Sequence, residues 1–140
     1  MRASRALKRS RARGAFAVEF ALVLSVAILL LFGGFDVCRL LWTKISVAQM
    51  AREGSRYASV RGSTTATPAQ TASATTAYVQ SIAAGLPNPQ ITVSWTQIGS
   101  GDRNTPGDLV TVRVAQAFNW HFAPLSDTTL VSQSSRIISY

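Results

Sequence analysis

A long apolar run near the N-terminus limits what this chain can fold into. From Ala15 to Phe35 the run contains a single charged residue, Glu19. As a helix, at about 1.5 Å per residue, it would be roughly 31 Å long, close to the thickness of the hydrocarbon core of a lipid bilayer. The sequence therefore predicts a transmembrane helix over residues 15–35, with the lipid bilayer as its surroundings.

The residues before this run predict its orientation. The leader, residues 1–14, contains no acid, and its basic residues are Arg2, Arg5, Lys8, Arg9, Arg11 and Arg13. Most of the formal net charge of +8 therefore lies in the leader. Lys and Arg on the short flank of a span usually mark the cytoplasmic side, so we expect the N-terminus inside and everything after Phe35 outside. A basic end is also typical of nucleic-acid binding, but these charges lead directly into a span, and we expect no nucleic-acid partner.

Two other interpretations of the N-terminus were weighed. A cleaved secretory signal peptide has a shorter apolar core than Phe20–Phe35, and its cleavage site requires small residues where Asp36 and Arg39 stand. A lipoprotein signal does not fit either, because Phe35 and Val37 precede the single cysteine, Cys38. With one cysteine the chain forms no intramolecular disulfide.

The helical pattern continues beyond the predicted span. From Asp36 to Ser59 there is no proline, and Gly54 is the only glycine. Apolar or small residues recur three, four or seven apart, as expected of one face of an amphipathic helix; they are Val37, Leu41, Ile45, Ala48, Ala51 and Ala58. We predict one continuous helix over roughly 15–60, with an amphipathic extension at 36–61. Its stripe would pack against the globular part of the chain, against neighbouring helices, or against both on different segments.

The remaining residues predict a small α+β domain. Residues 62–77 are rich in Ser, Thr and Ala and are predicted as a linker that grades into a second helix, with Thr67 as its N-cap and Pro68 in its first turn. The extracytoplasmic domain is placed at 78–140. Alternating patterns predict strands at 91–96, 109–118 and 128–140, which would form a three-stranded antiparallel sheet. One face of the sheet would pack on the second helix and on the end of the first.

No catalytic constellation is visible in the sequence. His121 is the only histidine, and it lies between two aromatic residues. Asp102, Asp108 and Asp127 lie in polar turns, where aspartate usually binds backbone N–H groups; a calcium site in the 102–108 loop is the alternative, although the loop fits no ligand pattern. We expect a structural protein rather than an enzyme, without metal or cofactor.

Two motifs resemble a known family. The residues Gly14-Ala-Phe-Ala-Val-Glu19-Phe20 resemble the processing site of prepilins. The longer segment 14–62, which includes Ala51-Arg-Glu-Gly-Ser-Arg-Tyr-Ala58, resembles the TadE-like family of tight-adherence (Flp) pilus assembly proteins.

The resemblance implies a pseudopilin or minor pilin that acts in pilus assembly. A prepilin peptidase would cut after Gly14, so that the mature subunit begins at Ala15 in the cytoplasmic (inner) membrane. Other pilins or pseudopilins and an inner-membrane assembly platform would be its partners. TadE and TadF proteins share this layout, and the sequence does not separate them. The alternative is an uncleaved single-pass protein whose outer domain binds an envelope or assembly partner.

Glu19 is the unusual residue of the span, because a carboxylate near the membrane interior costs on the order of 2.5–3.5 kcal/mol on insertion scales. Cleavage would create an ammonium at Ala15, one helical turn away, and Glu19 could pair with its own ammonium or with that of a neighbouring subunit. Glu19, followed by Phe20, is therefore the predicted assembly determinant. The other explanation is that the helix dipole favours an acid near a helix N-terminus.

Overall fold

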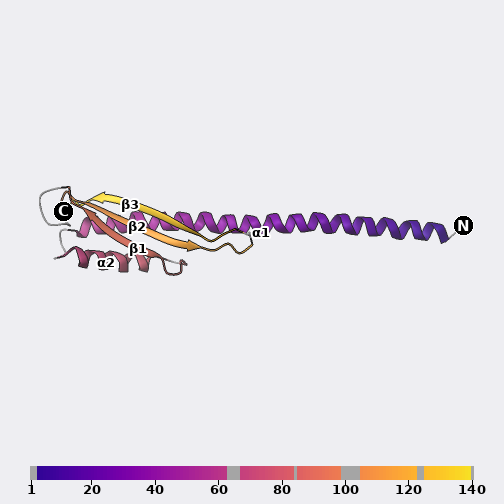
Figure 1. The fold of residues 1–140 in the computed structure, drawn as a ribbon, viewed down its shortest axis with the longest axis horizontal. Coiled ribbons are helices and arrows are strands. Elements are labelled where there is room, and N and C mark those ends of the chain that lie inside the picture. The colour runs from indigo at the N-terminus through magenta and orange to yellow at the C-terminus, as the bar shows by residue number, and fades with distance from the viewer. Residues whose placement is uncertain (1–2, 63–66, 84, 99–104, 123–124, 140) are drawn as a thin grey trace.

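A long helix carries a small α+β domain at its C-terminal end (Figure 1). The computed structural model of the protein describes residues 3–62, 67–83, 85–98, 105–122 and 125–139, with side chains described from Gly14 onward. The elements, in chain order, are α1 (Ala3–Arg61), α2 (Pro68–Ser81), β1 (Gln90–Thr96), β2 (Leu109–Phe118) and β3 (Thr128–Ile137). The predicted α+β layout is confirmed.

Helix α1 has two halves in different surroundings. Its N-terminal half projects away from the domain, and Figure 1 shows no other element beside it. The most apolar window of the helix has a mean hydropathy of 2.6 and is not buried at all. Among the described residues, α1 is the one helix long and apolar enough to cross a membrane. The helix is continuous, as predicted, but it begins at Ala3 instead of near Ala15, so the backbone of the leader extends the same helix.

Helix α2 begins as its capping residues predict. The side chain of Thr67 accepts a hydrogen bond from the backbone N–H of Gln70, and Pro68 occupies the first turn, where its missing N–H has no helical partner to lose. The division into a 62–77 linker and a 78–140 domain differs from this arrangement, because the helix already occupies the stretch from Pro68 onward. The helix propensity of the Ala residues, combined with the burial of Thr71, Thr75 and Val79, outweighs the linker-like composition.

The three strands form an antiparallel sheet in the order β1-β2-β3. Val93, Val112 and Ser134 lie side by side across it. Every second residue of β2 from Val110 to Phe118 is buried, whereas the other face of the sheet is partly or fully exposed. Strands β1 and β2 match their predicted bounds within one residue, while β3 ends at Ile137, before the predicted 140.

The core lies between one face of the sheet and both helices, but α1 supplies more of it than α2. Val47, Met50, Ala51 and Ala58 of α1 are buried in it, against Val79 of α2. Both helices predicted as partners of the sheet contact it, and α1 is the larger partner. The amphipathic half of α1 offers a longer buried face than the short α2, and it packs directly over β2 and β3.

Small residues allow α1 to approach the sheet closely. A Cβ atom on Gly54 would lie 2.7 Å from Cγ2 of Val79 and 3.0 Å from Cγ1 of Val112. The hydroxyl oxygen of Ser55 lies 2.9 Å from that of Ser134 on β3, within hydrogen-bonding distance. The segment 51–58, which carries the second motif of the resemblance, is thus the part of α1 that packs on the sheet.

The predicted apolar stripe of α1 packs on the domain over only part of its length. Ala51 and Ala58 are buried in the core, but Val37, Leu41 and Ile45 keep 48%, 53% and 58% of their surface exposed. The residues that α1 turns toward the domain in this region are instead Asp36, Thr43 and Val47, since the membrane-proximal end of the domain contacts a different side of the helix. The exposed residues Val37, Leu41 and Ile45 are called the outer stripe below.

The distal end of α1 carries a surface ion pair. Arg56 donates a hydrogen bond to Glu53 at 3.0 Å, and this bond raises the pKa of Arg56. The pair is exposed, so it adds little to stability. Nearby, the rings of Tyr57 and Tyr78 stack at 4.3 Å and join α1 to α2.

Candidate functional site: the cleavage segment and the membrane-proximal junction

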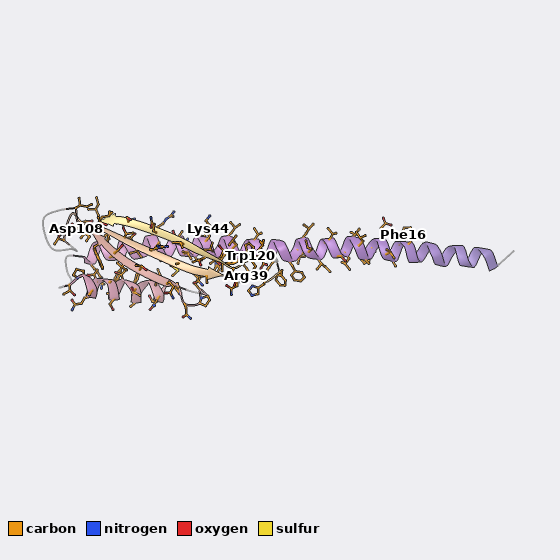
Figure 2. The ribbon with its side chains drawn as sticks, viewed as in Figure 1. Phe16, Arg39, Lys44, Asp108 and Trp120 are labelled. Atoms are coloured by element: carbon orange, nitrogen blue, oxygen red, sulfur yellow. The ribbon has the colours of Figure 1, made fainter. Side chains whose placement is uncertain are left out.

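The predicted processing residues lie on the free half of α1. Gly14, Ala15, Glu19 and Phe20 are all exposed, and a Cβ on Gly14 would meet nothing within 4 Å. Figure 2 marks the neighbouring Phe16, which is 71% exposed and far from the domain. The segment is therefore accessible on all sides to an enzyme or to another subunit.

Glu19 has no hydrogen-bond or salt-bridge partner among the described side chains. In the uncleaved chain the nitrogen of Ala15 belongs to a peptide bond and carries no charge. The proposed pair of Glu19 with an ammonium can therefore form only after cleavage, and the structure of the full-length chain leaves the carboxylate open to a partner.

A second polar site, missed by the sequence analysis, lies where α1 enters the domain. Asp36 is fully buried. Its Oδ2 accepts the backbone N–H of Phe122 at 2.8 Å and that of His121 at 3.2 Å. These two amides belong to the connection between β2 and β3, so one carboxylate holds this connection on the helix at the end of the apolar run.

Arg39, one turn further along α1, completes the junction. Its Nη1 donates to Oδ1 of Asp36 at 3.2 Å and lies 2.6 Å from Nδ1 of His121. The same Nδ1 lies 3.2 Å from the backbone oxygen of Asn119, so the guanidinium needs this atom as an acceptor and the carbonyl needs it as a donor. The Cζ atom of Arg39 also lies 5.3 Å from the ring centroid of Phe118, a cation–π distance. Figure 2 labels Arg39 and Trp120, which both lie at this end of the domain.

Aromatic rings extend the junction toward the membrane half of α1. Phe122 stacks on Phe32 with ring centroids 4.6 Å apart, and Trp120 meets Phe118 edge to face at 5.2 Å. Phe32 belongs to the apolar run that is predicted to span the bilayer. The β2–β3 connection therefore reaches back along α1 past Phe35, the last residue of the apolar run.

Two hollows flank the junction. The first, of about 370 Å³, is lined only by apolar residues and a cysteine: Leu31, Phe32, Phe35, Cys38 and Phe122. The second, of about 440 Å³, is more polar and lies between α1, the turn after α2 and the end of β2. Trp42 lines the second hollow and is 51% exposed.

Asp108 supports the opposite end of the domain (Figure 2). Its carboxylate accepts the backbone N–H of Ile98 at 3.0 Å, and both the N–H and the hydroxyl of Thr105, at 3.2 Å and 2.9 Å. This is the backbone-binding role expected of aspartate in a turn. Asp102 lies outside the described residues, so the 102–108 loop is described only in part. Among the described residues, no group of three or more His, Cys, Asp or Glu side chains is placed to hold a metal ion.

Comparison with known proteins supports the resemblance. Residues 14–56 match the family described as TadE-like protein. The match covers the predicted cleavage segment, the apolar run, Asp36 and Arg39, and most of the segment 51–58 that packs on the sheet. No curated protein and no solved structure matches the chain.

Proposed function

We propose that this TadE-like chain is a pseudopilin or minor pilin of a tight-adherence pilus, which is processed after Gly14 and acts structurally in pilus assembly. The match over 14–56 supports a role associated with this kind of pilus. The α+β domain at the end of α1 is larger than a main fibre subunit of such pili would carry, which favours a pseudopilin or minor pilin.

The observation that carries the proposal is the exposure of α1 on both sides of the membrane boundary. The outer stripe, formed by Val37, Leu41 and Ile45, continues the apolar surface of the span into the region beside the domain. Apolar residues at this spacing on an unpaired helix face are typical of helix-in-groove or helix–helix contacts. A subunit that packs α1 against neighbouring α1 helices would cover this stripe.

Glu19 would set the register of such packing. After cleavage, the ammonium of Ala15 needs a partner in apolar surroundings, and the exposed carboxylate of Glu19 on a neighbouring subunit supplies one. A buried pair of this kind contributes specificity more than net stability.

The location follows from the same arrangement. The basic leader favours a cytoplasmic N-terminus, with α1 spanning the inner membrane once and the α+β domain outside. The partners would then be the prepilin peptidase, other pilins or pseudopilins, the inner-membrane assembly platform and the bilayer. A reporter enzyme fused after Tyr140 tests the orientation, since it should be active only outside the cytoplasm; activity inside would overturn the proposed topology.

Processing is tested by the mass of the membrane-bound protein. In cells that contain a prepilin peptidase, the native chain should begin at Ala15, whereas Gly14→Arg should keep residues 1–14, because a long charged side chain cannot occupy a site for a small residue. Ser10→Arg adds the same charge within the leader and is the control that should still be cleaved. A native chain that keeps its leader would instead favour the uncleaved single-pass protein with a binding domain outside.

A further inference from the structure

The connection between β2 and β3 carries apolar side chains at the end of the domain from which α1 projects. Phe122 and Leu125 are 51% and 59% exposed, and Trp120, two residues before Phe122, is partly buried. Together these three residues are called the apolar tip below. The tip lies at the end of the domain from which the bare half of α1 projects (Figures 1 and 2).

We propose that the apolar tip enters the outer leaflet of the bilayer beside α1 and forms a second membrane contact of the protein. The proposal rests on the proposed placement of α1 as a single membrane span. The occupant of the hollow between Phe122 and α1 is then lipid acyl chain.

The depth of the tip follows from its contact with α1. Phe122 stacks on Phe32, and at about 1.5 Å per residue Phe32 lies roughly 4–5 Å inward of Phe35, the end of the apolar run. Amphipathic segments that lie in a membrane surface bury their apolar side about 5–10 Å into the boundary between headgroups and acyl chains. A tip at the level of Phe32 is therefore at the depth of such a segment.

The chemistry of the hollow fits lipid. Its lining residues present aliphatic and aromatic groups and one thiol, with no charged group. Tryptophan and other aromatic residues are favoured at the membrane interface, where one end of the side chain is apolar and the other is wet. Arg39 lies on the domain side of the tip, where the interface is polar.

Asp36 removes the main obstacle to this placement. Irregular backbone at membrane depth is tolerated only when its polar groups find partners within the protein. The N–H groups of His121 and Phe122, at the start of the tip, are both bound by the buried carboxylate of Asp36. The junction thus supplies the two donors with an acceptor that does not depend on water.

The experiment places a fluorescent label on single cysteines in the full chain, reconstituted in vesicles of phosphatidylethanolamine and phosphatidylglycerol. The native Cys38 is first changed to Ser. The tip is labelled through Phe122→Cys and, separately, through Leu125→Cys, which leaves the stacking on Phe32 intact. Ile98→Cys is the matched control, since Ile98 is an apolar residue with 64% exposure at the far end of the domain, next to Asp108.

A nitroxide quencher attached near the top of the lipid acyl chain should remove most of the fluorescence of both tip labels and little of that of the Ile98 label. Soluble iodide should show the opposite order. Tip labels that lipid quenches no more than the Ile98 label would overturn the proposal. Tip labels shielded from iodide without lipid quenching would assign the hollow to a protein partner, and this too would overturn it.

A fourth label separates this inference from the proposed function. Leu29→Cys lies on the bare half of α1, where Leu29 is 71% exposed. If the Leu29 label is quenched by lipid and the tip labels are not, the single span stands and only the tip proposal fails. If the Leu29 label is not quenched, the span itself fails, and the tip proposal fails with it.

Discussion

Replacing Asp36 by alanine should release the β2–β3 connection from α1. The native carboxylate is buried and accepts two backbone N–H groups, at 2.8 Å and 3.2 Å, while it also pairs with Arg39 at 3.2 Å. A hydrogen bond to a charged group contributes about 1.5–3 kcal/mol, so the two amides alone give roughly 3–6 kcal/mol. Part of this is recovered because the amides become hydrated once the released connection moves away from α1. A net loss of about 2–4 kcal/mol for closing the connection is expected.

Hydrogen exchange measures this loss where it occurs. The full chain in nanodiscs is digested after labelling, and the peptide that contains His121 and Phe122 is followed by mass spectrometry. A loss of about 2–4 kcal/mol corresponds to exchange that is roughly 30- to 700-fold faster. Asp36→Asn keeps one acceptor oxygen and should fall between the native chain and Asp36→Ala. Asp127→Ala removes an exposed acid of the same connection and serves as the control.

Two outcomes would contradict this reasoning. Exchange of the His121–Phe122 peptide that is no faster in Asp36→Ala than in Asp127→Ala would show that the carboxylate does not hold the connection. Exchange that rises equally in all strands would show that Asp36 stabilises the whole domain. The β2–β3 connection would then not open separately from the rest of the domain.

Three further changes test other parts of the molecule. Gly54→Ala should lower the melting temperature, because overpacking against Val79 costs about 1–3 kcal/mol and outweighs the helix propensity gain of about 1 kcal/mol; Gly34→Ala, where a Cβ meets nothing within 4 Å, should not lower it. Asp108→Ala should reduce the free energy of unfolding in urea by about 2–4 kcal/mol, since it removes hydrogen bonds to a buried charged acceptor, and an unchanged urea midpoint would refute this role. Glu19→Ala should leave insertion and cleavage intact but reduce crosslinking to other subunits about tenfold or more, as expected for a loss of at least about 1.4 kcal/mol. Crosslinking at the native level would mean that Glu19 only interacts favourably with the helix dipole. Failure of cleavage would instead show that the peptidase recognises Glu19.

The order and type of the elements could be predicted because each has a strong local signal. The apolar run, the cap formed by Thr67 and Pro68, and the alternation in β1 and β2 depend on neighbouring residues only. The choice of the buried side of α1 could not be predicted in the same way. Val37 and Ala51 fit the same periodic pattern, yet one is exposed and the other is in the core, because the sheet covers different sides of the helix along its length.

The junction was missed for a related reason. Asp36 was treated only as a residue unsuited to a signal-peptide cleavage site, although an acid directly after an apolar run is itself unusual. Its partners are backbone amides 85 and 86 residues further along the chain, and backbone amides carry no sequence signature. A signal was nevertheless present: a charged residue at the end of a span favours a polar partner, and the aromatic residues around His121 form a segment apolar enough to lie beside such a helix.

Helix α1 is continuous from Ala3 to Arg61, so the predicted span and the domain are joined by one rigid helix. A helix advances about 1.5 Å per residue and turns about 100° with each, so pulling the span out of the bilayer by one residue's rise without rotation would raise the whole domain by about 1.5 Å. If the helix also rotated about its axis during extraction, the outer stripe would turn to face a different direction. With the domain fixed to α1 by Asp36 and by the packing around Gly54, the direction in which the stripe faces is determined by the angle of the helix in the membrane. An assembly machine that grips the helix would therefore steer the outer domain directly, without any intervening joint to absorb the motion.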